Sequence, residues 1–300
     1  MKLNFKVLLI LSCMAVCSYS AFAGDIKHKF LATDESGNQL LYVDEFNPAN
    51  DWTIPLQGNR DICLVSPERC LVSVPGGYRE YEIKTGKMIK EMILPRMKDV
   101  KGRGGRSWSM VRRPDGRTFV GYRDSIFELD ENDKVVREIK TSAGGYFRLL
   151  RMSKEGHFLF TSGATKIKEV DNNGKLVKEV DIVQSVSDAK KPYFADRLDN
   201  GHTLVSTGYG ASLLEFDQDW KLVMTLGGRG KIPGVDFTFF FGQVQRLNNG
   251  NYMIAHWTGH KKEDSKKAPQ VLEMTKDGKV VWKWHHPERA GSVHGIAVIE

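Results

Sequence analysis

Short stretches of alternating apolar and polar residues recur along the chain, and polar turns separate them. The segments RLDNGHTLVSTG (197–208) and RLNNGNYMIAHW (246–257) nearly repeat each other about fifty residues apart. Each has an apolar strand before an Asn-Gly turn and a strand rich in β-branched or aromatic residues after it, a pattern that predicts an antiparallel hairpin. Further copies are VRRPDGRTFVGY (111–122), LRMSKEGHFLFTSG (150–163) and a weaker LVSPERCLVSVPGG (64–77).

A second phrase follows each hairpin and predicts two more strands. It reads SIFELDENDKVVREI in one copy and QVLEMTKDGKVVWKW in another. One glutamate recurs at the same place in the phrase, at gaps of 46, 41, 46 and 58 residues, as Glu82, Glu128, Glu169, Glu215 and Glu273. We expect its charge to be solvated or paired with Lys or Arg on the neighbouring outer strand. Four short strands per repeat, without helical periodicity, are typical of β-propeller blades.

The two ends of the chain together supply one further blade. The segment from Lys29 to Leu56 contains three strands without a first one, and SVHGIAVIE (292–300) supplies a lone first strand. We therefore predict an all-β fold, a six-bladed β-propeller of four-stranded antiparallel blades in which the C-terminal strand completes the N-terminal blade. Closure of this kind leaves no sheet edge open to aggregation.

The repeated turn carries a resemblance to known families. The phrases RLDNGHTL and RLNNGNYM resemble the "leucine, polar, Asn-Gly" turns of quinoprotein-like and arylsulfotransferase-like propellers, and the whole chain after the signal looks most like secreted bacterial six-bladed propellers without an assigned function. The arylsulfotransferase resemblance implies a histidine that accepts a sulfuryl group. Quinone-dependent relatives use more blades and a pair of adjacent cysteines, which this chain lacks, so no cofactor is expected. A shared repeat indicates fold more than activity.

Residues 1–23 have the pattern of an export signal. Lys2 and Lys6 precede an apolar run, and a small-residue cleavage site ends at Ala23. Residues 24–300 then form a single propeller domain, and we expect the protein to be periplasmic or secreted. A lipoprotein is the alternative, with its anchor at an earlier cysteine, but the residues before both candidates fit such a cleavage site poorly.

Composition narrows the class of partner. The apolar run is too short for a spanning helix, and no later segment approaches the roughly 18 apolar residues that a membrane span needs. Removing the signal lowers the formal charge from +7 to +5. The densest basic cluster, HKKEDSKKAP (260–269), also contains two acids, so nucleic acid is not expected as a partner. The expected partner is a small-molecule or glycan ligand, or another protein, and the chain is expected to be a monomer.

Two cysteines, Cys63 and Cys70, remain after signal removal and flank a predicted turn. An oxidising compartment permits a disulfide between them. The alternative is two small buried thiols that never pair, because the sequence alone does not fix the register of the hairpin.

The loops on one face of the predicted ring are long, whereas the hairpin turns on the other face are tight and leave little room for a site. Long loops on a rigid scaffold commonly carry binding and catalysis. This face is rich in arginine, which binds carboxylate or sulfate, and in rings that stack on sugars. Arg148 and His294, which lead into first strands, are expected to form a polar centre at the channel mouth. The predicted ligand-binding residues are Arg106, Trp108, Tyr146, Arg148, Tyr193, Tyr209, His256, Trp257 and His294.

No catalytic residue is assigned from the sequence. His256 and His260 are four apart, but this spacing converges on a metal only in a helix, so no metal site is expected. Several carboxylates are available near the long-loop face: Asp34, Glu35, Asp124, Asp196 and Asp236.

We predict an exported propeller that binds a glycan or small anionic ligand at the long-loop mouth of the channel. The alternative is an enzyme acting there on sugars or sulfate esters, as a lyase, a hydrolase or a sulfotransferase-like protein. An enzyme should show a convergent His, Arg and carboxylate cluster with shifted pKa values, whereas a binding protein should show a broad aromatic surface. A purely structural protein should have its channel plugged by side chains.

Overall fold

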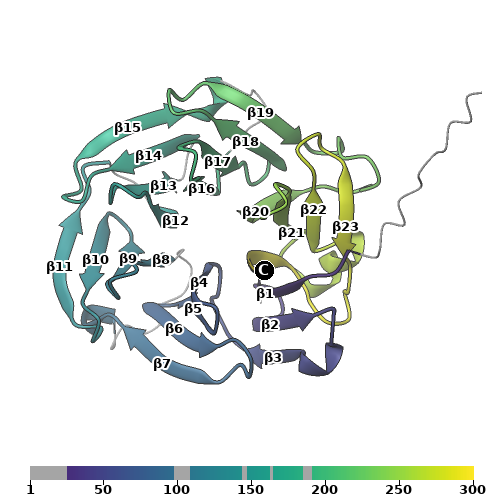
Figure 1. Ribbon diagram of the computed structural model, residues 1–300, viewed down its shortest axis with the longest axis horizontal. Helices are drawn as coiled ribbons and strands as arrows, with labels where there is room; N and C mark the ends of the chain where they lie inside the picture. Colours follow the sequence, from purple (N-terminus) through teal and green to yellow (C-terminus); the bar gives the residue numbers. More distant parts are fainter. Residues whose placement is uncertain (1–25, 98–108, 144–146, 163–164, 185–190) are drawn as a thin grey trace, which may run out of the picture.

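The strands form a ring of six four-stranded sheets around a central channel (Figure 1). This computed structural model describes residues 26–97, 109–143, 147–162, 165–184 and 191–300. Neighbouring strands run antiparallel within each sheet. The predicted six-bladed β-propeller is confirmed.

Each of the first three blades has its first strand nearest the channel. Blade one contains β24 (Val293–Ile299), β1 (Lys29–Asp34), β2 (Gln39–Asp44) and β3 (Trp52–Pro55). Blade two contains β4 (Ile62–Ser66), β5 (Arg69–Val74), β6 (Gly77–Glu82) and β7 (Met88–Ile93). Blade three contains β8 (Ser109–Arg112), β9 (Thr118–Tyr122), β10 (Ser125–Leu129) and β11 (Val135–Lys140).

The remaining three blades repeat this order. Blade four contains β12 (Phe147–Met152), β13 (Phe158–Ser162), β14 (Lys166–Val170) and β15 (Leu176–Asp181). Blade five contains β16 (Phe194–Arg197), β17 (Thr203–Ser206), β18 (Ser212–Phe216) and β19 (Leu222–Gly227). Blade six contains β20 (Phe240–Arg246), β21 (Tyr252–Trp257), β22 (Val271–Met274) and β23 (Val280–Trp284). The helices of the described residues are short 3-10 segments: η1 (Pro48–Asn50), η2 (Pro95–Met97), η3 (Ile182–Gln184) and η4 (Lys262–Lys267).

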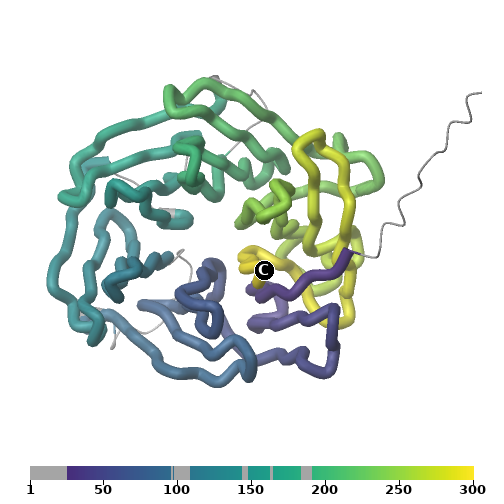
Figure 2. The backbone as a smooth tube through the Cα atoms, viewed as in Figure 1, coloured from purple at the N-terminus to yellow at the C-terminus, as the bar shows by residue number. Residues whose placement is uncertain are grey.

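The C-terminal strand closes the ring as predicted. β24 pairs antiparallel with β1, with Ala32 opposite Ile296 and Lys29 opposite Ile299. Figure 2 shows the yellow end of the chain lying beside the first purple strand. The last residues of the sequence therefore supply the inner strand of blade one.

The repeated Asn-Gly phrase builds the same tight hairpin in blades five and six. Gly201 and Gly250 both have left-handed backbone, with φ of 82° and 85°, a conformation that costs glycine little. Their amides donate to the carbonyls of Leu198 and Leu247 at 2.9 and 2.8 Å. The phrase recurs because each hairpin needs a left-handed residue at this place.

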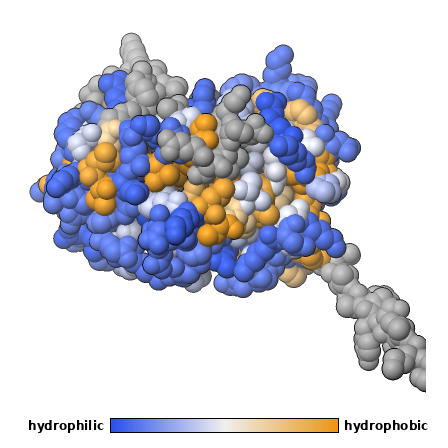
Figure 3. All heavy atoms as spheres, turned by 90° about the horizontal axis from the view of Figure 1, so that it is seen from above, coloured by the Kyte–Doolittle hydropathy of each residue, from blue (hydrophilic) through white to orange (hydrophobic). Residues whose placement is uncertain are grey.

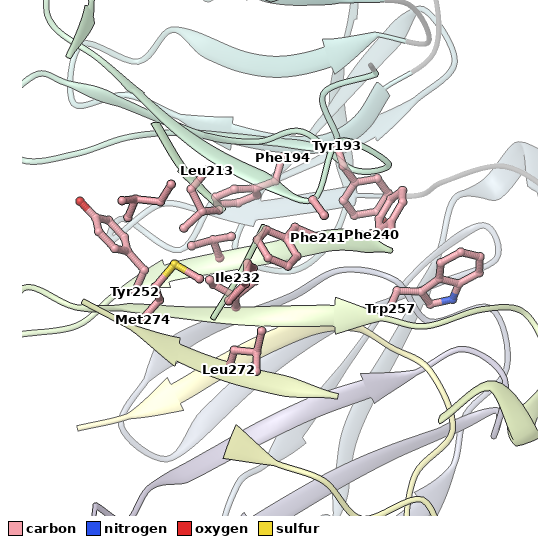
Figure 4. Close-up of a cluster of buried hydrophobic side chains, with 14 of the residues drawn as sticks. Tyr193, Phe194, Leu213, Ile232, Phe240, Phe241, Tyr252, Trp257, Leu272 and Met274 are labelled. Atoms are coloured by element: carbon pink, nitrogen blue, oxygen red, sulfur yellow. The ribbon is translucent and has the colours of Figure 1, made fainter. Parts of the chain in front are cut away.

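Apolar side chains between adjacent blades make up the core. In the cluster between blades five and six, Phe194, Phe241 and Tyr252 are almost fully buried. Figure 4 shows this cluster extending to Tyr193, Phe240 and Trp257 at the end where β21 finishes. One end of an ordinary hydrophobic core thus reaches the channel mouth.

In blade two, the recurring glutamate lies two residues before the position that the sequence alignment gives it. A β-bulge directly follows Glu128, Glu169 and Glu273 in their strands, and in blade two the bulge directly follows Glu80. Glu80 is therefore the structural equivalent and Glu82 is not. Glu80 is buried, with 2% of its side chain exposed, and Lys90 of the outer strand β7 lies 3.7 Å from its Oε2 atom, so of the two predicted environments the paired one holds and the solvated one does not.

Most of these glutamates link one blade to the next. Glu80 accepts a hydrogen bond from Arg112 of blade three at 2.8 Å, and Glu169 accepts one from Arg197 of blade five at 2.7 Å. Glu215 accepts from the hydroxyl of Tyr252 in blade six at 2.9 Å. Removal of such a carboxylate would leave its partner buried and unpaired, which is costly.

The two cysteines are free thiols. Cys63 lies opposite Leu71 in the β4–β5 pair, and Leu64 lies opposite Cys70. Since successive side chains in a strand alternate between faces, the two thiols project from opposite faces of blade two. The register therefore prevents the disulfide that the sequence left open.

The side of the ring seen in Figure 3 is mostly hydrophilic. Figure 3 shows hydrophobic groups set among hydrophilic ones on the side of the ring in view. Outer strands carry some exposed apolar side chains, including Val136, Val177 and Val223. Within the described ranges, no helix has the length and apolar character needed to cross a membrane.

Candidate functional site

Residues at the start of the first strands meet at the long-loop mouth of the channel. Arg60 precedes β4, Arg148 lies in β12, Tyr193 directly precedes β16 and His294 lies in β24. These strands are the inner strands of blades one, two, four and five (Figure 1), so the four side chains come from four different blades. They border a small cavity of about 90 Å³, here called the long-loop cavity. Its lining residues are Glu35, Arg60, Arg148, Lys191, Pro192, Tyr193, Tyr209, Phe240, Trp257, His260 and His294.

The carboxylate of Glu35 is the centre of the hydrogen-bond network in this cavity. Its Oε2 atom accepts from His294 Nε2 at 2.9 Å and from Trp257 Nε1 at 3.1 Å. Its Oε1 atom accepts from the guanidinium of Arg60. Both oxygens are thus occupied by donors, so Glu35 is suited to hold other groups in place and not to take up a proton.

Aromatic rings fix the imidazole of His294. The rings of Tyr193 and Trp257 each lie 5.3 Å from it at angles near 30°, and the ring of Phe240 lies 5.5 Å away, nearly perpendicular. His294 is 5% exposed. The hydrogen bond from Nε2 to Glu35 and the surrounding rings together fix the orientation of the imidazole.

Burial and charge keep His294 neutral. Desolvation lowers the pKa of His294 and the nearby guanidinium groups of Arg60 and Arg148 lower it further, although Glu35 acts in the opposite direction. Burial would raise the pKa of Glu35, but the hydrogen bonds and charges of His294 and Arg60 lower it below its usual range. The pair is therefore a neutral imidazole beside an ionised carboxylate.

The proton of the imidazole can be assigned from this pairing. An ionised carboxylate is only an acceptor, so Nε2 of His294 carries the hydrogen and Nδ1 is a bare acceptor. Nδ1 is buried and has no hydrogen-bond partner among the described residues, and the same holds for the hydroxyl of Tyr193. Buried polar atoms are usually satisfied, so these two atoms, on residues that line the same cavity, make it the candidate functional site.

Two cations at the edge of the cavity have no carboxylate partner in the part of the chain that the structure describes. Arg148 lies against the ring of Tyr193, with its guanidinium carbon 6.0 Å from the ring centroid. Lys191 is exposed and has left-handed backbone, with φ of 68°. Strained backbone of this kind in a non-glycine residue is often found at functional sites. Both cations are available to an anionic group.

The structure brings together five of the residues predicted from the sequence: Arg148, Tyr193, Tyr209, Trp257 and His294. Their role in ligand binding stays a prediction. Arg106, Trp108 and Tyr146 lie outside the described residues.

His256 lies apart from the cavity. It is fully buried, its Nδ1 donates to the carbonyl of Pro269 at 2.8 Å, and its Nε2 accepts from the amide of Phe239 at 3.1 Å. Both ring nitrogens are satisfied inside the protein, so this histidine holds the loop after β21 in place.

Sequence reasoning did not assign Arg60, Lys191 or His260 to the site. Arg60 is the residue of blade two that corresponds to Arg148 in blade four. The hairpin phrase of blade two is the weakest copy of the repeat, so the sequence does not reveal this correspondence. Glu35 was counted only as an available carboxylate, since nothing local in the sequence shows that a turn in blade one meets a strand from the far end of the chain. No group of three or more His, Cys, Asp and Glu side chains suited to a metal occurs among the residues described.

Comparisons with solved structures show the same fold. A protein of unknown function from Bacteroides caccae is 22% identical with a TM-score of 0.74, covering 92% of this chain and 100% of its own. A streptogramin B lyase is 14% identical with a TM-score of 0.59, over 89% of this chain and 83% of its own. A catalytically inactive histidine-to-alanine form of virginiamycin B lyase from Staphylococcus aureus, with quinupristin, is 11% identical with a TM-score of 0.54, over 89% and 77%.

At these identities the likeness shows the propeller fold alone. No protein-family model matches the chain, and no curated protein matches it. The resemblance to quinoprotein-like and arylsulfotransferase-like families therefore has no family-model support.

Proposed function

We propose that the long-loop cavity is an acid–base active site that carries out an elimination on a small substrate with an anionic or carbonyl group. One observation carries the proposal: His294 is held by Glu35 through Nε2, while its buried Nδ1 atom has no partner among the described residues. A neutral, oriented imidazole with a free lone pair is the form that a general base requires.

The arrangement supplies the other parts of such a reaction. Nδ1 of His294 would take a proton from the carbon beside the carbonyl or carboxylate, the C–H electron pair would form a carbon–carbon double bond, and the leaving group would depart with its bonding pair. Arg148 and Lys191 would stabilise negative charge on the substrate oxygen. The hydroxyl of Tyr193 lacks a partner and would donate a proton to the leaving group, so that atoms and charge balance.

Glu35 acts as a positioning residue in this scheme. It holds His294 in one tautomer and one orientation, as a carboxylate does for the histidine of hydrolase triads. The lyases among the similar structures, one of them inactivated by replacing a histidine, support a lyase as the reaction class. The export expected from residues 1–23 would place the site outside the cytoplasm.

Binding without chemistry is the second candidate. Three aromatic rings pack together at the cavity, those of Tyr209, Phe240 and Trp257. The ring centroids of Tyr209 and Phe240 are 4.9 Å apart, and Tyr209 is 37% exposed. Such rings with adjacent cations suit a glycan or small anionic ligand.

The test is a continuous ultraviolet assay for a double bond conjugated to a carbonyl. The panel contains uronate oligosaccharides and a streptogramin B cyclic peptide, incubated with wild type, His294→Ala, Glu35→Gln and the control His286→Ala, which changes an exposed histidine paired with Glu288. We expect turnover in wild type and His286→Ala and a loss of roughly 100-fold or more in His294→Ala. Turnover that survives in His294→Ala overturns the mechanism. Binding of the same compounds by calorimetry without turnover in wild type would favour the second candidate.

A further inference from the structure

A second and larger cavity opens at the opposite mouth of the channel, among the tight hairpin turns. It has a volume of about 690 Å³ and is bordered by the first strands β4, β12, β16, β20 and β24. This volume lies within the range of roughly 300–1,000 Å³ common for ligand pockets. The expectation that the tight-turn face leaves little room is therefore wrong. We propose that this tight-turn cavity is a second ligand site, selective for a small neutral polyol such as a monosaccharide.

The two cavities are separated inside the channel. Arg151 of blade four reaches across to Asp61 of blade two, with Nη2 and Oδ1 2.8 Å apart. Gln243 of blade six donates from Nε2 to the carbonyl of Ile62 in blade two at 2.8 Å. Of the residues described, none lines both cavities. The tight-turn cavity is thus a separate site with its own chemistry, and it does not depend on the function proposed for the other mouth.

Two residues with side-chain hydrogen-bond acceptors, Gln243 and Asp196, line the tight-turn cavity. Gln243 is 7% exposed, and its Oε1 atom is buried without a partner among the described residues. The carboxylate of Asp196 also lines the cavity and accepts a hydrogen bond from the backbone amide of Arg197. Burial raises the pKa of Asp196 to about 6, with Asp61 adding to the rise and Arg151 and Arg197 opposing it. At slightly alkaline pH this group is an ionised acceptor, and a ligand with hydroxyl donors would satisfy both residues.

Charges around the cavity are largely cancelled. The guanidinium of Arg151 is paired with Asp61, and that of Arg197 is paired with Glu169 at 2.7 Å. Arg246 and Asp196, which also line the cavity, have no ion-pair partner among the described residues but carry opposite charges. Each first strand has only one neighbour in its sheet, so its other edge faces the channel with backbone donors and acceptors. A surface of mixed donors and acceptors with cancelled charge favours a neutral molecule with several hydroxyl groups. This differs from the long-loop cavity, where the described residues supply no carboxylate partner for Arg148 or Lys191, two charges of the same sign.

The experiment is a ligand-observed NMR screen of neutral hexoses and pentoses against the full chain from Gly24, with matching uronic acids and amino sugars as comparison. Affinity for any hit is then measured by calorimetry in wild type, Asp196→Asn and Arg148→Ala. We expect a neutral sugar to bind wild type and Arg148→Ala equally and to bind Asp196→Asn roughly tenfold more weakly, the loss of one hydrogen bond to a charged acceptor. Backbone amide shifts from Val244 to Gly250 should move on addition of the sugar.

The location is tested separately from the class of ligand. Equal affinity in wild type and Asp196→Asn, with no shifts between Val244 and Gly250, would place the sugar elsewhere and overturn the proposed site. Binding only of uronic acids or amino sugars would overturn the neutral class. If no compound binds the folded chain, the cavity is a water-filled vestibule and the proposal is wrong. Activity at the long-loop cavity would stand in each case, because Arg148→Ala and His294→Ala report on that cavity alone.

Discussion

Glu35 and His294 lie 259 positions apart in the sequence and their side chains meet at 2.9 Å. Glu35 follows the second strand of blade one, and His294 belongs to the C-terminal strand that completes the same blade. The strand pairing that closes the ring also aligns this pair. The candidate site therefore exists only in the closed propeller, because an open blade one would separate the imidazole from the carboxylate that orients it.

Replacing Glu35 by glutamine should lower the pKa of His294 further. The carboxylate favours the protonated imidazole, whereas burial, Arg60 and Arg148 oppose it, so removal of the negative charge leaves only opposing effects. Histidine side-chain nitrogen shifts followed through a pH titration measure this directly. Glu288→Gln, which alters an exposed carboxylate beside His286, serves as control and should leave His294 unchanged. A pKa that stays constant or rises in Glu35→Gln would contradict the pairing.

The register of blade two can be tested with two glutamates two residues apart. Glu80→Ala removes the partner of Arg112, a side chain only 14% exposed, and we expect a loss of about 3 kcal/mol in the free energy of unfolding. Glu82→Ala removes a hydrogen bond with Thr85 in an exposed turn and should cost less than about 1 kcal/mol. Denaturant unfolding of the two variants gives both values. Equal losses, or a larger loss in Glu82→Ala, would support the alignment made from sequence.

The two cysteines should resist both labelling and oxidation in the folded chain from Gly24. Burial, helped by the charge of Asp61, raises the pKa of the Cys63 thiol to about 12, and burial also raises the pKa of Cys70. Only the thiolate reacts readily. Ellman's reagent should therefore react slowly with native protein and fast with protein in guanidinium. Cys70→Ser leaves Cys63 to report alone, and a disulfide detected by mass after mild oxidation would refute the register.

Much of the fold follows from local sequence because each hairpin carries its own turn chemistry. The Asn-Gly turns ending at Gly201 and Gly250 identify their hairpins without any long-range information. The closing strand is also recognisable, since the N-terminal segment lacks the first strand of a blade and the C-terminal segment supplies one. Blade two departs from the pattern because its β-bulge follows Glu80 and not Glu82. Only the strand pairing shows which of the two glutamates is equivalent to those of the other blades.

The site is less predictable because it depends on contacts between blades. Arg148, Tyr193 and His294 could be found from their equivalent places before first strands, but their convergence on Glu35 requires the closed ring. His256 has the residue type of a ligand group, yet its neighbours Phe239 and Pro269 satisfy both nitrogens. Residue type alone does not distinguish such a histidine from His294, whose Nδ1 is unsatisfied among the described residues.

The buried state of His256 should make the stability of the protein depend on pH. Burial lowers the pKa of His256 from 6.5 to about 4, so the folded state holds it neutral while the unfolded chain takes up a proton below about pH 6.5. Unfolding therefore binds a proton in this window, and the free energy of unfolding falls as pH drops towards 4. The full contribution is present above pH 6.5, and the loss amounts to about 3 kcal/mol at the lower end.

The comparison of wild type with His256→Gln isolates this contribution from the many carboxylates that titrate in the same range. Urea unfolding at several pH values should show a shallower fall in stability for His256→Gln than for wild type, even though the variant starts less stable because the bonds with Phe239 and Pro269 are altered. His286→Gln removes a histidine whose side chain is 45% exposed and should keep the wild-type slope. Parallel profiles for wild type and His256→Gln would mean that His256 is protonated as easily in the folded protein as in the unfolded chain, against the burial that the structure shows.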